Sequence, residues 1–351
     1  MPADIAIAGS GPVGCVLALL LKSGGGSVAL VQEPGAPAFP FRPIALSHAS
    51  RLILERVGAW EALAPTPIER VHVSQQGGFG RAELRASDAG VPALGYVLDY
   101  GALLHRLRAL VEERQIPVER APGGALLTVH AEGSSAESRH KDYRQEAVVA
   151  LVATRASAPG TAWERFTPEG PLALLPLAGR LAAVWGMRPE RAQELAQAPE
   201  GAFLAALAQA IGRRAGEFVA AGERARVPLA LRVRRSRVGE RAAFVGNAAQ
   251  TLHPVAGQGL NLGLRDAWDL AQVLQDAADP GAADVLRRFA ALRRVDAAST
   301  VRVTDFLAGA FLGADPIAGL MRGIGLTALD ICLPARRFFA RRMIYGASAL
   351  P

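Results

Sequence analysis

Residues 246–266 are the part of this chain best suited to hold a flat, electron-rich ligand. They follow the apolar run 242–245, cross a glycine-rich loop and enter a helical pattern. Gly257 and Gly259 carry no Cβ, so a ring could approach their backbone amides closely. The N-terminus of the following helix adds a partial positive charge at the same place. We therefore expect this junction to bind a ring oxygen or a diphosphate.

The N-terminus carries a second pattern of this kind. The buried-strand pattern of residues 4–8 runs directly into a GxGxxG motif formed by Gly9, Gly11 and Gly14. In a dinucleotide fingerprint the first glycine permits a tight turn, the second lets a pyrophosphate approach, and the third allows close strand–helix contact. The next strand, 28–31, leads to Glu33, which could accept hydrogen bonds from a ribose diol. An ordinary glycine-rich turn is the alternative. Nucleotide binding is favoured because the strand, the glycine motif, the next strand and the acidic residue follow one another in the order of the fingerprint.

Composition narrows the class of protein. The 351 residues include 39 lysines and arginines against 32 acidic residues, and the net charge is +7. The positive charge is dispersed, so we expect no nucleic-acid partner. Cys15 and Cys332 belong to no CxxC or Cys/His cluster, which predicts neither a disulfide framework nor a metal site. No secretory signal is visible and no apolar run reaches the ~20 residues of a membrane-spanning helix, so the cytoplasm is expected.

Apolar periodicity predicts the elements that position these loops. Helical spacing predicts helices at 51–57, with Ser47 or Ser50 as the cap, at 103–111 and at 200–211. Alternating or apolar runs predict strands at 71–74, 82–86, 96–98, 147–153, 163–166, 172–177 and 182–185. The chain thus passes between a nucleotide domain and a second, sheet-containing domain.

With these motifs in this order, the chain resembles the class A FAD-dependent aromatic monooxygenases. More narrowly it resembles the ubiquinone-biosynthesis hydroxylases, of the octaprenyl-methoxyphenol hydroxylase type. The matching motifs are the GxGxxG fingerprint, FRPIALS at 41–47, LILERVGAW at 52–60, DYRQEAV at 142–148, WERF at 163–166, GPLALLP at 170–176 and HPVAGQGLNLGLRD at 253–266. The resemblance covers nearly the whole chain.

The resemblance implies an α/β fold with three parts. The first is a Rossmann-like FAD-binding domain of the three-layer ββα, glutathione-reductase-like type. Inserted into it is an antiparallel-sheet substrate domain, and helices follow at the C-terminus. With the predicted elements, the parts are expected at 1–69, 96–140 and 235–300 (FAD-binding), 70–95 and 141–234 (substrate), and 301–351 (C-terminal helices).

The resemblance also implies an FAD site, residue by residue. The ADP half is expected on Gly9, Gly11, Pro12, Gly14 and Glu33, with Glu132 and Gly133 where relatives carry an Asp-Gly element. Arg42 is expected near the pyrophosphate, where its guanidinium could hold phosphate oxygens in a fork. Asn247 is expected near the ribityl chain. Around the flavin ring we expect Pro254, Gly257, Gln258, Gly259, Leu260 and Asn261.

Within this family NAD(P)H reduces FAD, O2 adds to give a C4a-hydroperoxide, and an electron-rich phenol attacks the distal oxygen. The implied activity is hydroxylation of a polyprenylated phenol in ubiquinone biosynthesis. His253 and Pro254 are the candidate catalytic residues. For His253, bracing the loop is the alternative to polarising the phenol.

Two features keep further alternatives open. Segment 117–140 is expected to be shorter than in relatives, which would suit a scaffold subunit that binds flavin weakly. The closer alternative to the implied activity is hydroxylation of another aromatic compound. Residues 303–333 are mostly apolar and an arginine-rich segment, 336–342, follows. These helices could contact the inner face of the membrane, another quinone-biosynthesis protein or a second copy of the chain, or simply pack on the FAD-binding domain.

Overall fold

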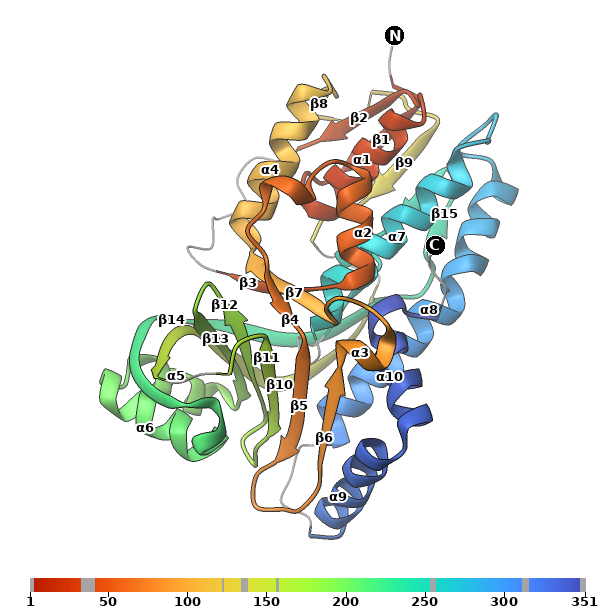
Figure 1. Cartoon of the computed structure of the whole chain (residues 1–351). Helices are drawn as coiled ribbons and strands as arrows, with labels where there is room; N and C mark the ends of the chain where they lie inside the picture. Colours follow the sequence, from red (N-terminus) through yellow and green to blue (C-terminus); the bar gives the residue numbers. More distant parts are fainter. Residues whose placement is uncertain are drawn as a thin grey trace.

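The computed structural model describes residues 3–32, 42–121, 123–133, 138–155, 158–252, 257–310 and 316–347. Two sheets dominate the arrangement in Figure 1, one in the upper and one in the lower part of the view, and the C-terminal helices run along one side of both. This mixed α/β architecture confirms the predicted fold class.

The upper sheet has six strands in the order β15-β16-β9-β1-β2-β8. Its strands are β1 (Ile5–Ala8), β2 (Val28–Val31), β8 (Val118–Glu119), β9 (Leu127–His130), β15 (Val238–Gly239) and β16 (Ala242–Phe244). The central strand β1 pairs in parallel with both β2 and β9. Both β1 and β2 are apolar throughout because helices cover them. In its described residues, the segment 117–140 contains β8 and β9, of two and four residues, and the start of β10 (Ser138–Arg155).

Three helices pack around this sheet: α1 (Pro12–Ser23), α4 (Tyr100–Glu113) and α7 (Gln258–Leu274). Pro12 occupies the first turn of α1, where its missing N–H costs no hydrogen bond. Asp99 caps α4 by accepting a hydrogen bond from the Ala102 N–H at 3.0 Å. The short helix α2 (His48–Arg56) has Ser47, one of the two caps that the sequence offers, as its N-cap; the Ser47 side chain accepts from the Ser50 N–H. The helix begins three residues earlier than the predicted range 51–57.

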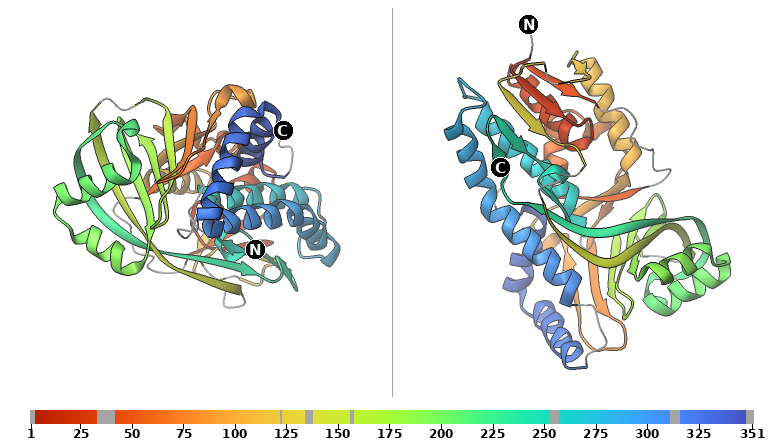
Figure 2. Two further views of the ribbon diagram at one scale, coloured as in Figure 1. Left: turned by 90° about the horizontal axis from the view of Figure 1, so that it is seen from below. Right: turned by 180° about the vertical axis from the view of Figure 1, so that it is seen from behind.

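The lower sheet has eight strands in the order β17-β14-β10-β13-β12-β11-β5-β6. Its strands are β5 (Arg70–Gln75), β6 (Arg81–Arg85), β10 (Ser138–Arg155), β11 (Thr161–Phe166), β12 (Pro171–Leu177), β13 (Arg180–Met187), β14 (Glu217–Arg234) and β17 (Gln250–Thr251). Figure 2 shows β10 and β14 as a long curved pair. Helices α5 (Pro189–Gln197) and α6 (Glu200–Ile211) cover one face of the sheet, over a core that includes Trp163, Trp185 and Phe203.

A small third sheet, β3 (Pro43–Ser47), β7 (Gly95–Asp99) and β4 (Thr66–Ile68), lies between the two large ones. The last helices of the chain are α8 (Ala283–Ala310), α9 (Pro316–Ile331) and α10 (Leu333–Tyr345). The expected limit between residues 300 and 301 falls within α8. The remaining short pieces are α3 (Ala86–Ala89) and the 3-10 turns Trp60–Ala62, Arg213–Ala215 and Gly246–Ala248. Among the helices described, none is both long and apolar enough to cross a bilayer.

A buried ionic cluster joins α7 to α8. The Arg293 guanidinium lies 2.7 Å from Asp266, 2.6 Å from Asp269 and 2.7 Å from Asp296, and Arg265 lies 2.9 Å from Asp296. Asp266 and Asp296 have no solvent-exposed side-chain surface. The Ala347 N–H also donates to Asp296 at 2.8 Å, so the same cluster holds the end of the C-terminal helices.

Candidate cofactor and substrate site

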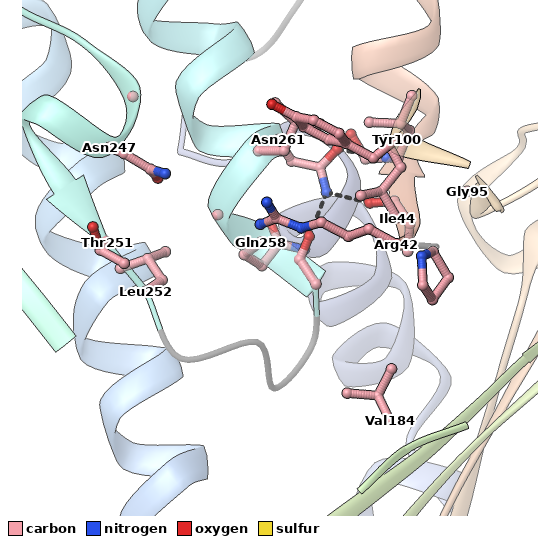
Figure 3. Close-up of a pocket in the computed structure, with 18 of the residues that line it drawn as sticks. Arg42, Ile44, Gly95, Tyr100, Val184, Asn247, Thr251, Leu252, Gln258 and Asn261 are labelled. Carbon is pink, nitrogen blue, oxygen red and sulfur yellow. Dashed lines mark hydrogen bonds between the residues drawn. The ribbon is translucent and has the colours of Figure 1, made fainter. Parts of the chain in front are cut away.

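One large cavity connects the two big sheets. Its volume is about 1970 Å³, well above the roughly 300–1,000 Å³ typical of a small-molecule pocket. Its wall has three parts: the loops at the ends of β1, β9 and β16, the N-terminal turn of α7 with β3, and one face of the eight-stranded sheet closed by α9 and α10. Figure 3 shows Arg42, Tyr100 and Asn261 on one side of this space, Asn247 and Leu252 on another, and Val184 below them. The dimensions suit a cofactor and a substrate together.

The N-terminal glycine loop forms one end of the cavity. Gly9 has a φ of +112°, and a Cβ there would lie 2.7 Å from the backbone nitrogen of Glu132. A Cβ on Gly14 would lie 1.9 Å from the Gly9 carbonyl oxygen. Both positions therefore require glycine so that α1 can start directly against β1 and β9. Gly11 instead faces open space, because a methyl group added there would have only the Tyr100 hydroxyl within 4 Å.

Positive charge gathers beside this loop. Arg42, Arg108 and Arg120 all line the cavity. The Arg42 guanidinium stacks on the Tyr100 ring at 4.9 Å, and Arg108 donates to the Ser10 hydroxyl at 3.4 Å. Both arginines sit where a diphosphate at the N-terminus of α1 would need counter-charges.

Glu132 supplies a negative group on the opposite side of the loop. Its Oε1 lies 2.6 Å from His130 Nδ1, and the His130 ring stacks on Phe244 with centroids 4.7 Å apart. Burial opposes ionisation, but hydrogen bonds from His130 and from two backbone N–H groups hold the pKa of Glu132 below its ordinary value. Its other oxygen, Oε2, is buried and accepts no hydrogen bond from the described residues. A sugar hydroxyl would satisfy this atom.

The N-terminus of α7 forms the middle of the cavity. Gly257 is its N-cap and adopts a left-handed conformation with φ +59°. A Cβ added to Gly259 would meet no atom within 4 Å, so this glycine leaves bare backbone facing the cavity. A helix of 17 residues directs a positive dipole end at this point, where it would stabilise negative charge on a flat ring.

Asn261 fixes this turn to the neighbouring strand. Its Oδ1 accepts from the Ser47 N–H at 2.8 Å and from the Ser50 hydroxyl at 2.7 Å. Its Nδ2 donates to the carbonyl oxygens of Ala45 at 3.0 Å and Gly257 at 2.8 Å. These four bonds use the whole capacity of the amide. The side chain therefore shapes the α7 turn and leaves its backbone to face a ligand.

Asn247 differs from Asn261 because its side chain is exposed and points toward the cavity (Figure 3). The loop that carries it is held from behind by Asp266, which accepts from the Gly246 N–H at 3.1 Å and from Gln250 at 2.8 Å. The buried ionic cluster thus positions the loop on which Asn247 stands.

The lower part of the cavity is mostly apolar, and its charged residues are Glu164 on β11 and Arg322 on α9. On β11, Ala162, Glu164 and Phe166 face the cavity, whereas Trp163 packs on the α6 side. Burial without a compensating charge raises the pKa of Glu164 to about 8. The facing helices contribute Leu326 from α9 and Met343 from α10.

Most residues predicted from the sequence meet at this cavity: Gly9, Gly11, Pro12, Arg42, Glu132, Gly133, Asn247, Gly257, Gln258, Gly259, Leu260 and Asn261. Gly14 lies in the first turn of α1, where it packs against Gly9. Glu33, His253 and Pro254 fall outside the described residues.

Sequence reasoning missed Arg108, Arg120, His130 and Glu164. For Arg108 a signal existed, because Tyr100, Leu104 and Arg108 recur every four residues and so share one face of α4.

Several observations fit a bound FAD. The backbone of Gly133 and Gly259 is open to the cavity. Glu132 Oε2 lacks a hydrogen-bond donor among the residues described. Arginines stand beside the helix N-terminus that a diphosphate would occupy.

Comparison with known proteins agrees with this geometry. Residues 121–304 match the family described as FAD binding domain. The chain is 32% identical to ubiquinone hydroxylase UbiL of Rhodospirillum rubrum, over 97% of this chain and 89% of that one. It is 29% identical to 3-demethoxyubiquinol 3-hydroxylase of Escherichia coli, over 94% and 95% of the two chains.

Among solved structures, p-nitrophenol 4-monooxygenase PnpA from Pseudomonas putida DLL-E4 matches with a TM-score of 0.78 at 16% identity, over 99% of both chains. At that identity the match supports the fold. The matched family and the sequence relatives show that the chain belongs to the FAD-dependent aromatic monooxygenases and, within them, to the ubiquinone hydroxylase family.

Proposed function

We propose that this protein uses FAD, NAD(P)H and O2 to hydroxylate the aromatic ring of a polyprenylated phenol in ubiquinone biosynthesis. A methoxyphenol with a long prenyl tail is the substrate we favour. The observation that carries the proposal is the single cavity, which joins a dinucleotide-type loop, a helix N-terminus and an apolar sheet face. The names of the relatives supply the pathway.

Within this proposal FAD would be held by residues that line the upper part of the cavity. Gly9, Gly11, Pro12 and Gly14 receive the diphosphate, with Arg42 and Arg108 as counter-charges. Glu33 and Glu132, with Gly133, take the sugar hydroxyls of the adenosine half, and Asn247 the ribityl chain. Pro254, Gly257, Gln258, Gly259, Leu260 and Asn261 surround the flavin ring.

Bound FAD, once reduced, supplies the activated oxygen for the reaction. The α7 amides would stabilise negative charge on the ring of reduced FAD, because they are already directed at that place. The apolar sheet face excludes water and holds the phenol against the cofactor. His253 and Pro254 remain our candidate catalytic residues, on the side of the flavin ring from which the substrate would approach. For His253, bracing the loop is the alternative role.

The substrate's tail supports a role for the C-terminal helices. Met321 lines the cavity and is 61% exposed, so it lies where the cavity meets the surface. Leu320 and Ile324 on the same helix and Phe338 on α10 are also exposed. We propose that this surface rests on the inner face of the membrane, or on another quinone-biosynthesis protein, and admits the tail. The proposal also keeps the expected domains. The FAD-binding domain comprises 1–69, 96–140 and 235–300, the substrate domain comprises 70–95 and 141–234, and the C-terminal helices comprise 301–351.

Gene deletion followed by lipid extraction tests the function. We expect ubiquinone to fall and a prenylated precursor lacking one ring hydroxyl to accumulate. Restoring the gene should reverse both changes. Unchanged quinone with no precursor would contradict the proposed pathway and favour a different aromatic substrate.

A further inference from the structure

Glu164 interrupts an otherwise apolar row of the eight-stranded sheet. Strand register aligns seven residues across the sheet: Ala82, Val73, Glu164, Ala173, Val184, Val149 and Ala225. Six of the seven are alanine or valine. A carboxyl without a partner in such a row lowers stability, because an unpaired charge there is unfavourable. Its presence therefore points to a function.

No group in the described part of the chain satisfies this carboxyl. Among the residues described, none forms a hydrogen bond or an ion pair with Glu164. The adjacent Arg165 donates to Ser74 at 3.2 Å, and on α9 the cavity-lining Arg322 donates to Gln75 at 3.2 Å. Other residues that line the cavity are apolar, among them Leu84 on β6, Leu326 on α9 and Met343 on α10. The carboxyl therefore faces only the cavity.

The position suits contact with a substrate ring. Val184, which lies below the cofactor region in Figure 3, is two strands from Glu164 in the same row. Two strand spacings amount to about 10 Å, the scale of a substituted ring with its polar groups. A ring placed against Val184 can thus direct its hydroxyl at Glu164.

We propose that Glu164 is the catalytic base that accepts the hydroxyl proton of the phenol substrate. The phenol O–H bond breaks and the proton moves to a carboxylate oxygen of Glu164. The electron pair stays on the phenol oxygen and raises electron density at the ring carbons that attack oxygen. The ring carbon that has gained oxygen then releases its own proton, the electron pair of that C–H bond restores the aromatic ring, and Glu164 returns its proton to the phenol oxygen. This assignment rests on the proposed function.

The pKa of Glu164 suits this role. Burial raises it to about 8, closer to the phenol value of about 10 than an ordinary glutamate at about 4.3. Proton transfer is most effective when the pKa of the base lies near the working pH. The active form is the ionised carboxylate, so the rate should rise with pH up to about 8.

Three variants of the full-length, FAD-loaded protein test the assignment: Glu164→Gln, Glu164→Leu and, as control, Glu217→Gln at an exposed position of β14. The probes are a methoxyphenol with a short prenyl chain and its O-methyl ether, which has no proton to donate. We expect Glu164→Leu to reduce the preference for the phenol over the ether about tenfold, as loss of a charge-assisted hydrogen bond predicts. The control should keep the native preference.

Turnover separates a base from a merely structural residue. Glu164→Gln should lower kcat on the order of 10²- to 10⁴-fold, with a smaller effect on KM. It should also abolish the rise of the rate toward pH 8. Its melting temperature should equal or exceed the native value, because it removes an unpaired buried carboxyl.

The outcomes separate the two proposals. A native protein that neither binds nor hydroxylates phenols contradicts the proposed function, and this assignment with it. Phenol hydroxylation that keeps its rate, its pH profile and its phenol preference in both Glu164 variants contradicts the assignment alone.

Discussion

The Oδ1 atom of Asn261 accepts a hydrogen bond from the backbone N–H of Ser47 at 2.8 Å. This contact joins the first turn of α7 to the end of β3, although the residues lie 214 positions apart in the chain. Both residues are buried. The relative position of the two walls that would enclose the flavin ring therefore depends on one amide.

Replacing Asn261 by alanine should loosen this joint. The buried Ser47 N–H and Ala45 carbonyl would lose their partner, and an unsatisfied buried group costs about 1–3 kcal/mol. We expect a lower free energy of unfolding and weaker FAD retention, measured by denaturant titration and by flavin release. Equal stability and equal retention would show that the joint does not shape the site.

Gly259→Ala should separate stability from cofactor binding. Alanine favours a helix over glycine by about 0.5–1 kcal/mol, and no atom obstructs a Cβ there. The apoprotein should thus be slightly more stable, while the methyl group occupies space needed by the ring and weakens FAD binding.

Gly201→Ala is the matched control for that change. Gly201 is the second residue of α6, as Gly259 is of α7, and its Cβ also meets nothing within 4 Å. It should gain similar stability without any change in FAD affinity. Equal FAD affinity in both variants would place the flavin elsewhere.

Arg293→Met should be strongly destabilising. Arg293 is buried among Asp266, Asp269 and Asp296, and removing one partner of a buried ion pair typically costs about 3–5 kcal/mol. The adjacent Arg294 is exposed, so Arg294→Met should leave the free energy of unfolding nearly unchanged. Denaturant unfolding of the two variants makes the comparison, and equal effects would contradict a structural role for the cluster.

The same cluster predicts how stability depends on pH. Burial opposes ionisation of Asp296, but Arg265 and Arg293 outweigh it and lower the pKa to about 2. An unfolded aspartate has a pKa of about 3.9. The contribution of Asp296 is therefore fully present above about pH 4 and is lost as the pH falls toward 2.

Unfolding measured across this range checks the prediction. Native protein should lose more stability between about pH 4 and 2 than Asp296→Asn does. If the free energy of unfolding fell equally with pH in the two proteins, the arginine neighbours would not stabilise ionised Asp296.

Local sequence patterns predict the parts of the site that consist of backbone. The glycine loop at Gly9 and the α7 turn at Gly257 were both expected, because strand, glycines and helix follow one another directly in the chain. Glu132 was expected as well, although its contact with His130 depends on the twist of β9.

Tertiary packing decides the rest. The strand β14 was not predicted, since its alanine- and arginine-rich sequence is as well suited to a helix; pairing along β10 holds it extended. The exposure of Glu164 to the cavity and the partners of Arg293 likewise depend on strands and helices distant in sequence.

Oxygen incorporation tests the central claim most directly. Full-length protein loaded with FAD should be given NAD(P)H, a short-chain prenylated methoxyphenol and isotopically labelled dioxygen, and the product analysed by mass spectrometry. The account predicts one added oxygen atom on the ring, carrying the label from dioxygen. NAD(P)H oxidation that yields only hydrogen peroxide, or a product whose new oxygen comes from water, would contradict it.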